Sequence, residues 1–556
     1  MSIIETRREQ IFPVLDAAQI ETAKRFASGP ERAFAPGEVV FDVGERNAPA
    51  WLVLKGSIDV VRRDGLKRET PITTHHVGQI SGEVSQLAGR DTLACGRAGA
   101  DGCTALPFDA THIRALMIGS AEVGEIVMRA FILRRVGLID DGGAGAVLVG
   151  IPGTAELSGL QDFLRRNGYP VTVLDAANDA EGRAMVERLG VPPADLPLML
   201  CPNGTVLRRP SNAEAGACLG ITPDLDPDLI YDVAIVGAGP AGLAAAVYAG
   251  SEGLSVIVLD SRAFGGQAGA SSRIENYLGF PTGISGMALA GRAFNQALKF
   301  GVEVAIPLQV SHLDCGDGNG HDSDPFKLEL TDGGAVRAKT VIVASGAAYR
   351  RPPIANLPVF EGAGVSYWAS PVEAKLCEGE EIALVGGGNS AGQAVVFLAP
   401  RVKRLHLIIR GEGLESSMSR YLIERIDALA NVELHTKTEV VALEGNETTG
   451  LTGAVFRDRS TGATHVCSLR HLFLFIGAEP NADWLDGCVA LDDKGFVLTG
   501  AKCGGRQGRP VLPLETSRPG VFAIGDVRAG STKRVAAAVG EGAAVVAQIH
   551  SVLAVE

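Results

Sequence analysis

Two glycine-rich stretches carry the clearest chemical signal in the sequence. In the first, an apolar run is followed by Gly237-x-Gly239-x-x-Gly242, an alanine-rich helical pattern and a second apolar run that ends at Asp260. Gly237 permits a tight turn, Gly239 lets the backbone approach a pyrophosphate, and Gly242 lets the helix pack on the strand. The carboxylate of Asp260 can accept hydrogen bonds from ribose hydroxyls. This order of features predicts a dinucleotide-binding unit.

A second stretch repeats the pattern. Gly386-x-Gly388-x-x-Ala391 follows an apolar run and precedes a helical pattern and another apolar run. At the position that corresponds to Asp260 the chain has Arg410, which can pair with a 2'-phosphate where an acid would repel it. The second site is therefore predicted to prefer NADPH over NADH.

Two dinucleotide sites in one chain imply one flavin and one nicotinamide. The C-terminal stretch supports this assignment, because the strand pattern GVFAIGD ends in Gly525 and Asp526 and places a carboxylate near a ribitol hydroxyl. A helix that starts at about Arg534 can aim its N-terminus at the isoalloxazine. The first and last segments are thus expected to form one FAD domain that an NADPH domain interrupts.

Composition and charge argue against several classes of partner. The net charge of -13 is spread over both halves of the chain without a Lys/Arg run, so neither nucleic acid nor an anionic membrane is expected. The first residues include two arginines but no apolar stretch behind them, so export is not expected. Residues 233–251 carry no charge, but their glycines and Pro240 fit a strand, a turn and a helix better than a membrane span.

Nine cysteines are scattered along the chain and are never spaced as C-x-x-C. This spacing argues against a redox pair that is local in sequence, and no metal site with closely spaced ligands is expected. Scattered thiols indicate a reducing compartment, so a cytoplasmic protein is predicted. Cys201 and Cys218 are interpreted as small buried hydrophobic residues.

At 556 residues the chain is too long for a single core and is expected to divide into several domains. Residues 1–140 alternate short strands with glycine turns and close with a helical pattern, which predicts a β-roll followed by a helix. The next domain is expected at 141–225. The FAD domain is expected at 226–349 and 477–556, with the NADPH domain at 350–476 between them.

The segment PGEVVFDVGERNAPAWLVLKGSIDVV and the later GQISGEVSQLAGRDTLA are similar to the cyclic-nucleotide-binding domain family. In that family a glycine-glutamate pair, here Gly82 and Glu83, meets the ribose, so the resemblance implies a cyclic nucleotide as a candidate ligand. The family's phosphate-binding arginine is absent, because Thr92 stands at about its place and Arg90 lies two residues early. Loss of that charge-assisted partner costs on the order of a few kcal/mol and weighs against the nucleotide.

Residues 141–225 follow the order strand, helix, strand, helix, hairpin, with Asn203-Gly204 as the turn. This order resembles the thioredoxin-like fold, and Leu196-Pro197 stands where that family has a cis-proline. The family's active site is a C-x-x-C at the start of the first helix, and the matching loop IPGTAELSGL has no thiol. The resemblance therefore implies a spacer or docking domain.

Residues 226–556 resemble the low-molecular-weight thioredoxin reductases through GAGPAG, FGGQAGASSRIENYLGFP, VIVASGA, GGGNSA, FIGAEPN and TSRPGVFAIGDV, in that order. The resemblance implies a homodimer whose NADPH domain rotates between reduction and reoxidation of the flavin. It implies FAD contacts at Gly266, Gln267, Asn276, Asp526, Arg534, Val535 and Ala536. It implies NADPH contacts at Gly388, Asn389, Ser390 and Arg410.

The active site of that family is Cys-Ala-Thr-Cys, which aligns here with the residues from Trp368 to Pro371. The chemistry needs two thiols at that spacing, because one thiolate attacks while the other resolves the intermediate. Trp368 and Pro371 therefore mark the positions of a missing catalytic pair. Either the indole lies against the flavin where the disulfide would sit, or Trp368 fills the volume that two thiols left.

The predicted fold class is α/β, with two Rossmann-like domains preceded by a β-roll and a thioredoxin-like domain. Three functions remain open. The first is an NADPH-dependent flavoenzyme that reduces a small quinone-like molecule, dioxygen or a partner's disulfide. The second is thioredoxin reduction through remote thiols such as Cys377. The third is a redox or nucleotide sensor with little turnover, in which the roll reads a ligand.

Overall fold

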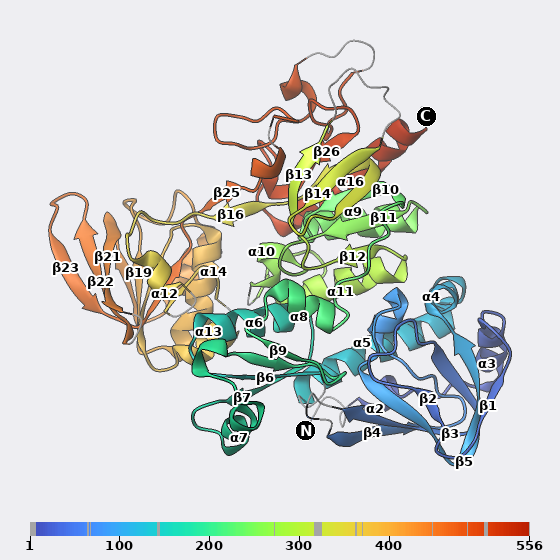
Figure 1. Cartoon of the computed structure of the whole chain (residues 1–556). Coiled ribbons are helices and arrows are strands. Elements are labelled where there is room, and N and C mark those ends of the chain that lie inside the picture. Colours follow the sequence, from blue (N-terminus) through green and yellow to red (C-terminus); the bar gives the residue numbers. More distant parts are fainter. Residues whose placement is uncertain are drawn as a thin grey trace.

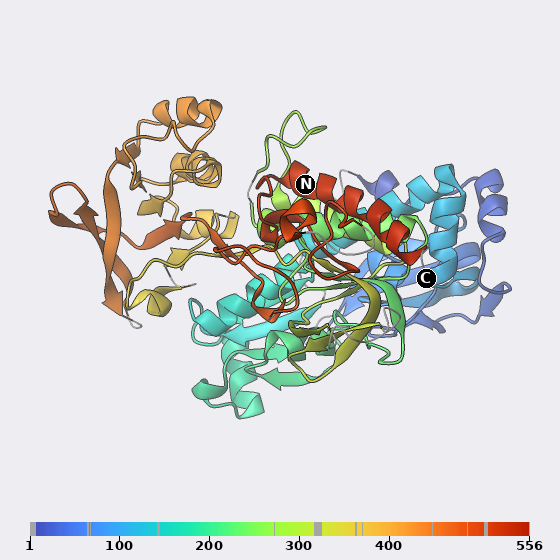
Figure 2. The same cartoon turned by 90° about the horizontal axis from the view of Figure 1, so that it is seen from above.

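The computed structural model describes residues 7–63, 66, 68–141, 145–271, 273–315, 325–361, 364–369, 371–446, 449–485, 487–504 and 510–554. These residues form an N-terminal roll, a small α/β domain, and a larger central domain into which another α/β domain is inserted (Figure 1). We call these units the roll, the small domain, the central domain and the inserted domain. The roll and the inserted domain lie on opposite sides of the central domain (Figures 1 and 2).

The roll is an antiparallel sheet covered by helices. Its strands have the order β1-β5-β3-β4, and β2 pairs with β5. Alternate residues of the long strand β3, such as Ile58 and Val60, are buried in its core. The elements are β1 (Arg32–Phe34), β2 (Val39–Phe41), β3 (Ala50–Arg63), β4 (Glu69–His75), β5 (Ala94–Phe108), α2 (Arg8–Ile11), α3 (Ala17–Lys24), α4 (Ala110–Gly119) and α5 (Ala121–Asp141).

The small domain has a four-stranded sheet in the order β7-β6-β8-β9, in which β6 and β7 are parallel and the other pairs antiparallel. The predicted hairpin turn is present, with Gly204 at φ +90°, and the Leu196–Pro197 peptide bond is cis. The elements are β6 (Ala146–Gly150), β7 (Val171–Asp175), β8 (Leu198–Leu200), β9 (Val206–Arg208), α6 (Ala155–Arg166), α7 (Ala180–Leu189) and α8 (Asn212–Cys218).

The prediction for Cys201 and Cys218 as unpaired hydrophobic residues is wrong, because the two form a disulfide. The bond joins the residue after β8 to the last residue of α8, and only the tertiary packing of that helix brings the thiols together. A second disulfide joins Cys315 and Cys488 in the central domain. Both pairs weaken the inference of a reducing compartment, since it rested on scattered unpaired thiols.

The central domain has a seven-stranded sheet in which β12, β11, β10, β15 and β26 are parallel and β13 and β14 form an antiparallel extension. The charge-free stretch is strand β10, a turn and helix α9, as predicted. The elements are β10 (Ile230–Val236), α9 (Pro240–Ser251), β11 (Val256–Leu259), α10 (Gly266–Gly269), α11 (Gly286–Lys299), β12 (Glu303–Ala305), β13 (Val310–Asp314), β14 (Phe326–Leu330), β15 (Ala335–Val343), β26 (Val521–Ala523) and α16 (Val535–Leu553).

The inserted domain has a parallel sheet in the order β17-β24-β18-β19-β20 and an antiparallel sheet β21-β22-β23. A two-stranded link of β16 (Ala347–Tyr349) and β25 (Ala478–Pro480) joins it to the central domain. Its elements are α12 (Leu357–Phe360), β17 (Val365–Ser366), α13 (Pro371–Leu376), β18 (Glu381–Val385), α14 (Asn389–Leu398), β19 (Arg404–Ile408), α15 (Arg420–Asp427), β20 (Val432–His435), β21 (Thr438–Asn446), β22 (Gly450–Asp458), β23 (Thr464–Ser468) and β24 (His471–Leu474).

Among the described helices, α16 is the one long and apolar enough to cross a membrane. One of its faces packs on α9, and Figure 2 shows the two helices side by side. Gly542 lies at this contact, where an added Cβ would be 2.5 Å from the carbonyl oxygen of Ala241 and 2.7 Å from the Cβ of Ala244. Gly540, two residues earlier, has no neighbouring atom within 4 Å of the same built position. The apolar face of α16 is therefore partly explained by helix packing inside the central domain.

These two glycines make a matched stability test. Gly540→Ala should raise the free energy of unfolding by roughly 0.5–1 kcal/mol, because alanine stabilises a helix interior relative to glycine. Gly542→Ala should lower it by about 1–3 kcal/mol, because the methyl group forces α9 and α16 apart. Thermal unfolding midpoints of the two variants measure both effects. Equal shifts in the same direction would show that the helices are not in close contact at Gly542.

Candidate functional site

The first glycine turn forms a cradle at the N-terminus of α9. Gly237 has φ +113°, and a Cβ there would lie 2.2 Å from the carbonyl oxygen of Ala344. A Cβ on Gly242 would lie 1.9 Å from the carbonyl oxygen of Gly237, so the turn itself requires both glycines. Gly239 caps α9 and has open space where its Cβ would be. The helix N-terminus and the open position beside Gly239 together form the arrangement that binds a pyrophosphate in dinucleotide-binding folds.

Asp260 follows β11 and lies at the same turn. Its Oδ2 accepts a hydrogen bond from the amide of Ala238 at 2.9 Å, and its Oδ1 accepts from the amides of Arg262 at 2.8 Å and Ala263 at 3.1 Å. These bonds fix the carboxylate beside the cradle. A carboxylate has about four acceptor positions, so capacity is left for a ribose hydroxyl.

Of the loop residues predicted to contact FAD, Gly266 lies at the cradle, whereas Gln267 and Asn276 lie toward the inserted domain. A Cβ on Gly266 would lie 3.0 Å from the Cα of Gly239, so the two backbones touch. The side-chain amide of Gln267 donates a hydrogen bond to the carbonyl oxygen of Ala347, at the link to the inserted domain. Asn276 is exposed and lines a surface hollow with Tyr421 of the inserted domain. The structure thus brings Gly266 to the cradle and places Asn276 at the boundary between the two domains.

The C-terminal segment completes this edge of the central domain. A Cβ on Gly525 would lie 2.9 Å from the Cβ of Ala241, next to the start of α9. Burial raises the pKa of the neighbouring Asp526 carboxyl. Helix α16 begins at Val535 with Arg534 as its N-cap residue, and the side chains of Arg534 and Ala536 are exposed.

Glu541 holds the Gly525 loop in place, and the sequence patterns did not point to it. Its Oε2 accepts a hydrogen bond from the Gly525 amide at 2.6 Å and from Nε of Arg528 at 3.2 Å. The side chains of Arg528 and Glu541 are largely buried, at 18% and 16% exposure, which strengthens their ion pair. Glu541 is thus the residue that fixes the Gly525 loop against α9.

The second glycine turn repeats the geometry in the inserted domain. Gly386 has φ +147°, and a Cβ there would lie 2.4 Å from the carbonyl oxygen of Phe475. Gly388 caps α14 and has open space at its Cβ position. Asn389 accepts a hydrogen bond from the amide of Ser419 at 2.6 Å, and Ser390 is exposed on the first turn of α14.

Arg410 lies just beyond β19 in a positively charged corner. Its carbonyl oxygen accepts a hydrogen bond from Nη1 of Arg459 at 3.4 Å, and the carbonyl oxygen of Gly411 accepts one from the amide of Lys437 at 2.9 Å. Glu412, the nearby acid, pairs with Nζ of Lys437 at 2.9 Å, and this bond lowers the pKa of its carboxyl. Lys437 is thus paired with Glu412 and Arg459 lies 3.9 Å from Glu439, whereas Arg410 is exposed and can pair with a 2'-phosphate.

Trp368 belongs to an aromatic cluster at the link between the two domains. Its ring lies 6.5 Å from that of Tyr349, which stacks on Tyr367 at 5.6 Å. Its indole Nε1 donates a hydrogen bond to Oε1 of Glu373 at 3.2 Å. Pro371 is the first residue of α13, and Ser370 lies outside the described residues. These contacts give Trp368 a packing role, and a contact with flavin stays a prediction.

Cys377 does not have the environment of a reactive thiol. It is 0% exposed, its Sγ donates to the carbonyl oxygen of Ala374, and burial raises its pKa to about 11. A reactive cysteine needs an accessible thiolate, which a lowered pKa provides. These properties argue against Cys377 as a remote thiol that takes part in thioredoxin reduction.

The small domain contacts the central domain and lies near the Trp368–Glu373 segment of the inserted domain, an arrangement that no sequence motif predicted. At the end of α6, Arg166 donates a hydrogen bond to the carbonyl oxygen of Gly266 at 2.8 Å, and Asn167 donates to that of Arg262 at 2.9 Å. Earlier in α6, burial and then the nearby Glu373 carboxylate raise the pKa of Asp162, although Arg166 opposes the shift. Helix α6 therefore lies between the Gly266 loop and the Trp368–Glu373 segment.

Side chains that could ligate a metal also gather in the inserted domain, although the sequence predicted no metal site. Nδ1 of His406 lies 2.9 Å from Nε2 of His435, and its Nε2 lies 3.0 Å from Oε1 of Glu381. Glu433 and Cys467 lie nearby. Glu433 and His435 share strand β20, but Glu381, His406 and Cys467 come from other strands, so sequence spacing alone could not reveal the cluster. The two imidazoles and Glu381 satisfy one another as a hydrogen-bonded chain.

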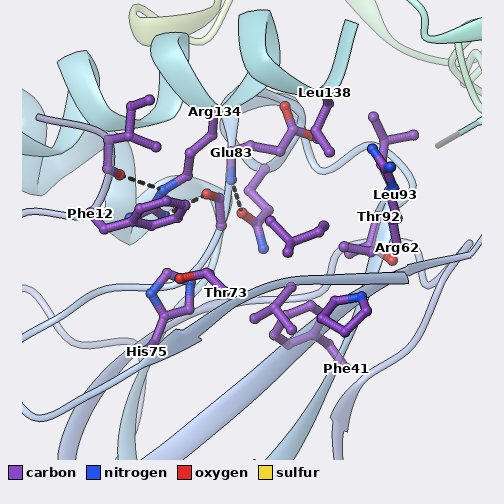
Figure 3. Close-up of a pocket in the computed structure, with 17 residues that line it drawn as sticks. Phe12, Phe41, Arg62, Thr73, His75, Glu83, Thr92, Leu93, Arg134 and Leu138 are labelled. Atoms are coloured by element: carbon purple, nitrogen blue, oxygen red, sulfur yellow. Dashed lines mark hydrogen bonds between the residues drawn. The ribbon is translucent and has the colours of Figure 1, made fainter. Parts of the chain in front are cut away.

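The cavity of the roll contains the residues predicted to meet a cyclic nucleotide (Figure 3). Gly82, Glu83 and Thr92 line it. Arg90 points elsewhere, because its Nη2 donates to the carbonyl oxygen of Val304 in the central domain at 2.8 Å. Arg90 therefore joins the roll to the central domain, and the cyclic nucleotide stays a prediction.

Comparisons with known proteins agree with the geometry of residues 231–542, which match the sequence profile described as pyridine nucleotide-disulphide oxidoreductase. A subunit of the alkyl hydroperoxide reductase of Pseudomonas putida is 34% identical over 315 residues, 56% of either chain. The thioredoxin reductase of Mycolicibacterium smegmatis is 32% identical over 320 residues, 57% of this chain and 94% of the relative. The chain thus spans little more than half the length of the hydroperoxide reductase subunit.

Solved structures give the same result. A thioredoxin reductase of Lactococcus lactis in the FR conformation is 25% identical, with a TM-score of 0.52 over 59% of this chain and 100% of that one. The thioredoxin reductase of T. acidophilum is 28% identical, with a TM-score of 0.51 over 58% of this chain and 98% of that one.

Removing the Arg410 guanidinium tests the second site. Arg410→Ala should raise KM for NADPH roughly tenfold or more, because a charge-assisted hydrogen bond to the 2'-phosphate is lost. KM for NADH should change little, since NADH has no such phosphate. Arg404→Ala at the opposite end of β19 is the control, and anaerobic reduction kinetics with each nucleotide provide the measurement. Parallel changes with both nucleotides would contradict the assignment.

Glu541 can be tested through flavin affinity. Glu541→Gln keeps the side-chain size but removes the charge that holds Gly525 and Arg528, so the Kd for FAD should rise about tenfold. Titration of the apoprotein with FAD, followed by flavin fluorescence, measures the constant. Glu424→Gln, which breaks an exposed ion pair on α15, should leave it unchanged. An unchanged Kd in Glu541→Gln would mean that the loop is held by other contacts.

Proposed function

Because the chain belongs to the pyridine nucleotide-disulphide oxidoreductase family, we propose that it catalyses hydride transfer from NADPH to FAD and passes the electrons to an acceptor other than an adjacent cysteine pair. Its relatives among the thioredoxin reductases and alkyl hydroperoxide reductases are flavoprotein oxidoreductases, and thioredoxin reductases use FAD and NADPH. When bound, these two cofactors supply the hydride and electron chemistry. The observation that supports the proposal is that the chain has both glycine cradles and, at 368–371, Trp368 and Pro371 in place of thiols.

The residues of the chain then have binding and orienting roles. The N-terminus of α9 holds the pyrophosphate of FAD, Asp260 orients its ribose, and Glu541 keeps the Gly525 loop in position. The N-terminus of α14 holds the pyrophosphate of NADPH, and Arg410 selects its 2'-phosphate. Trp368 excludes water from the space that a disulfide would occupy.

The acceptor is proposed to be a small quinone-like molecule, dioxygen or the disulfide of a partner protein. The strand order of the small domain and its cis Leu196–Pro197 bond support a thioredoxin-like domain without C-x-x-C, whose helix α6 acts in docking. On the resemblance alone, we also propose a homodimer in the cytoplasm.

A sensor is the second candidate function. The observation in its favour is that the roll, supported as cyclic-nucleotide-binding-like by its sequence, has a cavity lined by Thr92, while Arg90, two residues before it, contacts the central domain. In this hypothesis the flavin reports NADPH, and the ligand of the roll sets the response.

Anaerobic titration with NADPH tests the leading proposal. About one equivalent should bleach the flavin fully and no more should be consumed, because no dithiol stands beside the flavin. Cys377→Ser should give the same result. If the protein consumed further equivalents of NADPH, and Cys201→Ser or Cys315→Ser removed this extra consumption, the result would instead support electron transfer to the disulfides. A flavin that stays oxidised with NADPH would contradict the proposed donor.

A further inference from the structure

The cavity of the roll is a partly enclosed, mostly apolar space of about 240 Å³ between the sheet and helix α5 (Figure 3). Phe12, Phe41, Ile72, Leu93 and Leu138 form much of its wall. Concave apolar sites with a few convergent polar groups are typical of small-molecule binding. The polar groups in this cavity therefore indicate what the ligand must offer.

Three buried side chains that line the cavity have polar atoms without a hydrogen-bond partner among the described residues. They are Nη2 of Arg134, Nδ1 of His75 and Oε2 of Glu83, and the three residues are 8%, 3% and 9% exposed. Leaving a buried polar atom unpaired costs about 1–3 kcal/mol. Three such atoms around one space are groups with which a ligand of matching chemistry can pair.

The guanidinium of Arg134 indicates which charge the ligand should carry. Its Nε donates to the carbonyl oxygen of Ile11 at 2.9 Å, and its Nη1 donates to those of Ile80 and Gly82 at 2.8 Å each. These bonds hold the guanidinium at the wall of the cavity and leave Nη2 without a partner among the described residues. Burial first, and then the charge of Arg134, lower the pKa of His75, so this imidazole is neutral.

Two guanidinium groups share the carboxylate of Glu83. It forms an ion pair with Arg135 at 3.5 Å, and its charge also opposes the effect of burial, which lowers the pKa of Arg134. Because one carboxylate faces two cations in a buried place, the site favours an anionic ligand group. Oε2 of Glu83 favours a hydroxyl or an N–H on the same ligand.

The site differs from one built for a cyclic phosphate. The hydroxyl of Thr92, at the place of the missing arginine, donates to the carbonyl oxygen of Asp42 and accepts from the amide of Glu45 at 3.2 Å. Both hydrogen bonds of the Thr92 hydroxyl are therefore made within the protein, and the hydroxyl does not replace the missing arginine as a phosphate ligand. Arg90 has left the cavity for the central domain, where its guanidinium lies over the ring of Phe294 at 5.6 Å.

We propose that the roll binds a small monocarboxylic acid with an apolar body, its carboxylate at Arg134 and a hydroxyl or N–H at Glu83. The apolar body fills the space between α5 and the sheet.

The rim of the cavity is connected to the flavin-binding unit. Glu83 pairs with Arg135, whose Nε donates to the carbonyl oxygen of Gly168 in the small domain at 2.9 Å. Gly168 directly follows Arg166 and Asn167, the residues that hold the loops next to the first glycine cradle. A ligand that changes the position of Glu83 thus changes a chain of contacts that ends at that cradle. This part of the inference rests on the proposed function, because its effect is a change in the rate of flavin reduction.

Binding is tested on the full chain with octanoate, its neutral analogue octanamide, 3-hydroxyoctanoate and 3',5'-cyclic AMP, by saturation-transfer NMR and calorimetry. Octanoate should bind at least about tenfold more tightly than octanamide, because the amide has no charge for Arg134. 3-Hydroxyoctanoate should bind more tightly again through Glu83. Equal binding of octanoate and octanamide, or binding of cyclic AMP alone, would overturn the proposal.

Variants locate the site. Ile72→Trp fills the cavity and should abolish octanoate binding, whereas Thr70→Trp, on an exposed position of the same strand, should not. Arg134→Gln should remove the preference for octanoate over octanamide. Because Arg134 also holds three carbonyl oxygens and its loss can unfold the roll, Ile72→Trp is the deciding variant. Octanoate binding that survives Ile72→Trp would place the site elsewhere and overturn the proposal.

The connection to the flavin is tested by stopped-flow reduction with NADPH, with and without saturating octanoate. The rate should change at least about fivefold, and Arg166→Met, which breaks the last contact of this chain, should abolish the change while octanoate affinity stays the same. Binding without a change in rate would overturn the connection and leave the ligand assignment intact. A flavin that NADPH does not reduce in either condition would contradict the proposed function instead.

Discussion

The site depends on one close backbone approach, in which the start of α9 is enclosed by three other segments. Gly525 meets Ala241, Gly542 meets the carbonyl oxygen of Ala241, and Gly266 meets Gly239, each at a distance that leaves no room for a side chain. Because these segments come from distant parts of the sequence, the cradle forms only when the central domain is complete. The inserted domain interrupts that chain without disturbing it, since β16 and β25 leave and return side by side.

The small domain and the roll both contact the part of the chain that is proposed to bind the flavin. Because residues 368–371 contain no dithiol, the small domain cannot exchange thiols with a cysteine pair there. Its helix α6 nevertheless contacts the Gly266 loop through Arg166. The roll is joined to the same region by Arg90 and Arg135. The N-terminal half of the chain is therefore placed to influence the flavin-binding unit through contacts alone, without exchange of thiols.

The sequence was sufficient for features that follow from local geometry. The glycine turns, the helix start near Arg534 and the charge-free strand and helix could be predicted because each depends on residues within one short segment. The positions of Glu541 and Arg166 could not, since their partners are set by tertiary packing. The same reason explains the wrong prediction for Cys201 and Cys218, whose thiols meet only after α8 folds back on the sheet. Sequence spacing also could not show that Cys377 is fully buried, and this burial argues against a reactive thiol at that position.

The central claim is that electrons leave the flavin without passing through a cysteine pair. It is tested most directly by reducing the protein anaerobically with NADPH, alkylating it at once with iodoacetamide, and comparing the cysteines by mass spectrometry with an oxidised control. We expect a reduced flavin with no new alkylation at Cys201, Cys218, Cys315 or Cys488, which are paired as disulfides. New alkylation of either pair, in proportion to the NADPH consumed, would contradict the account.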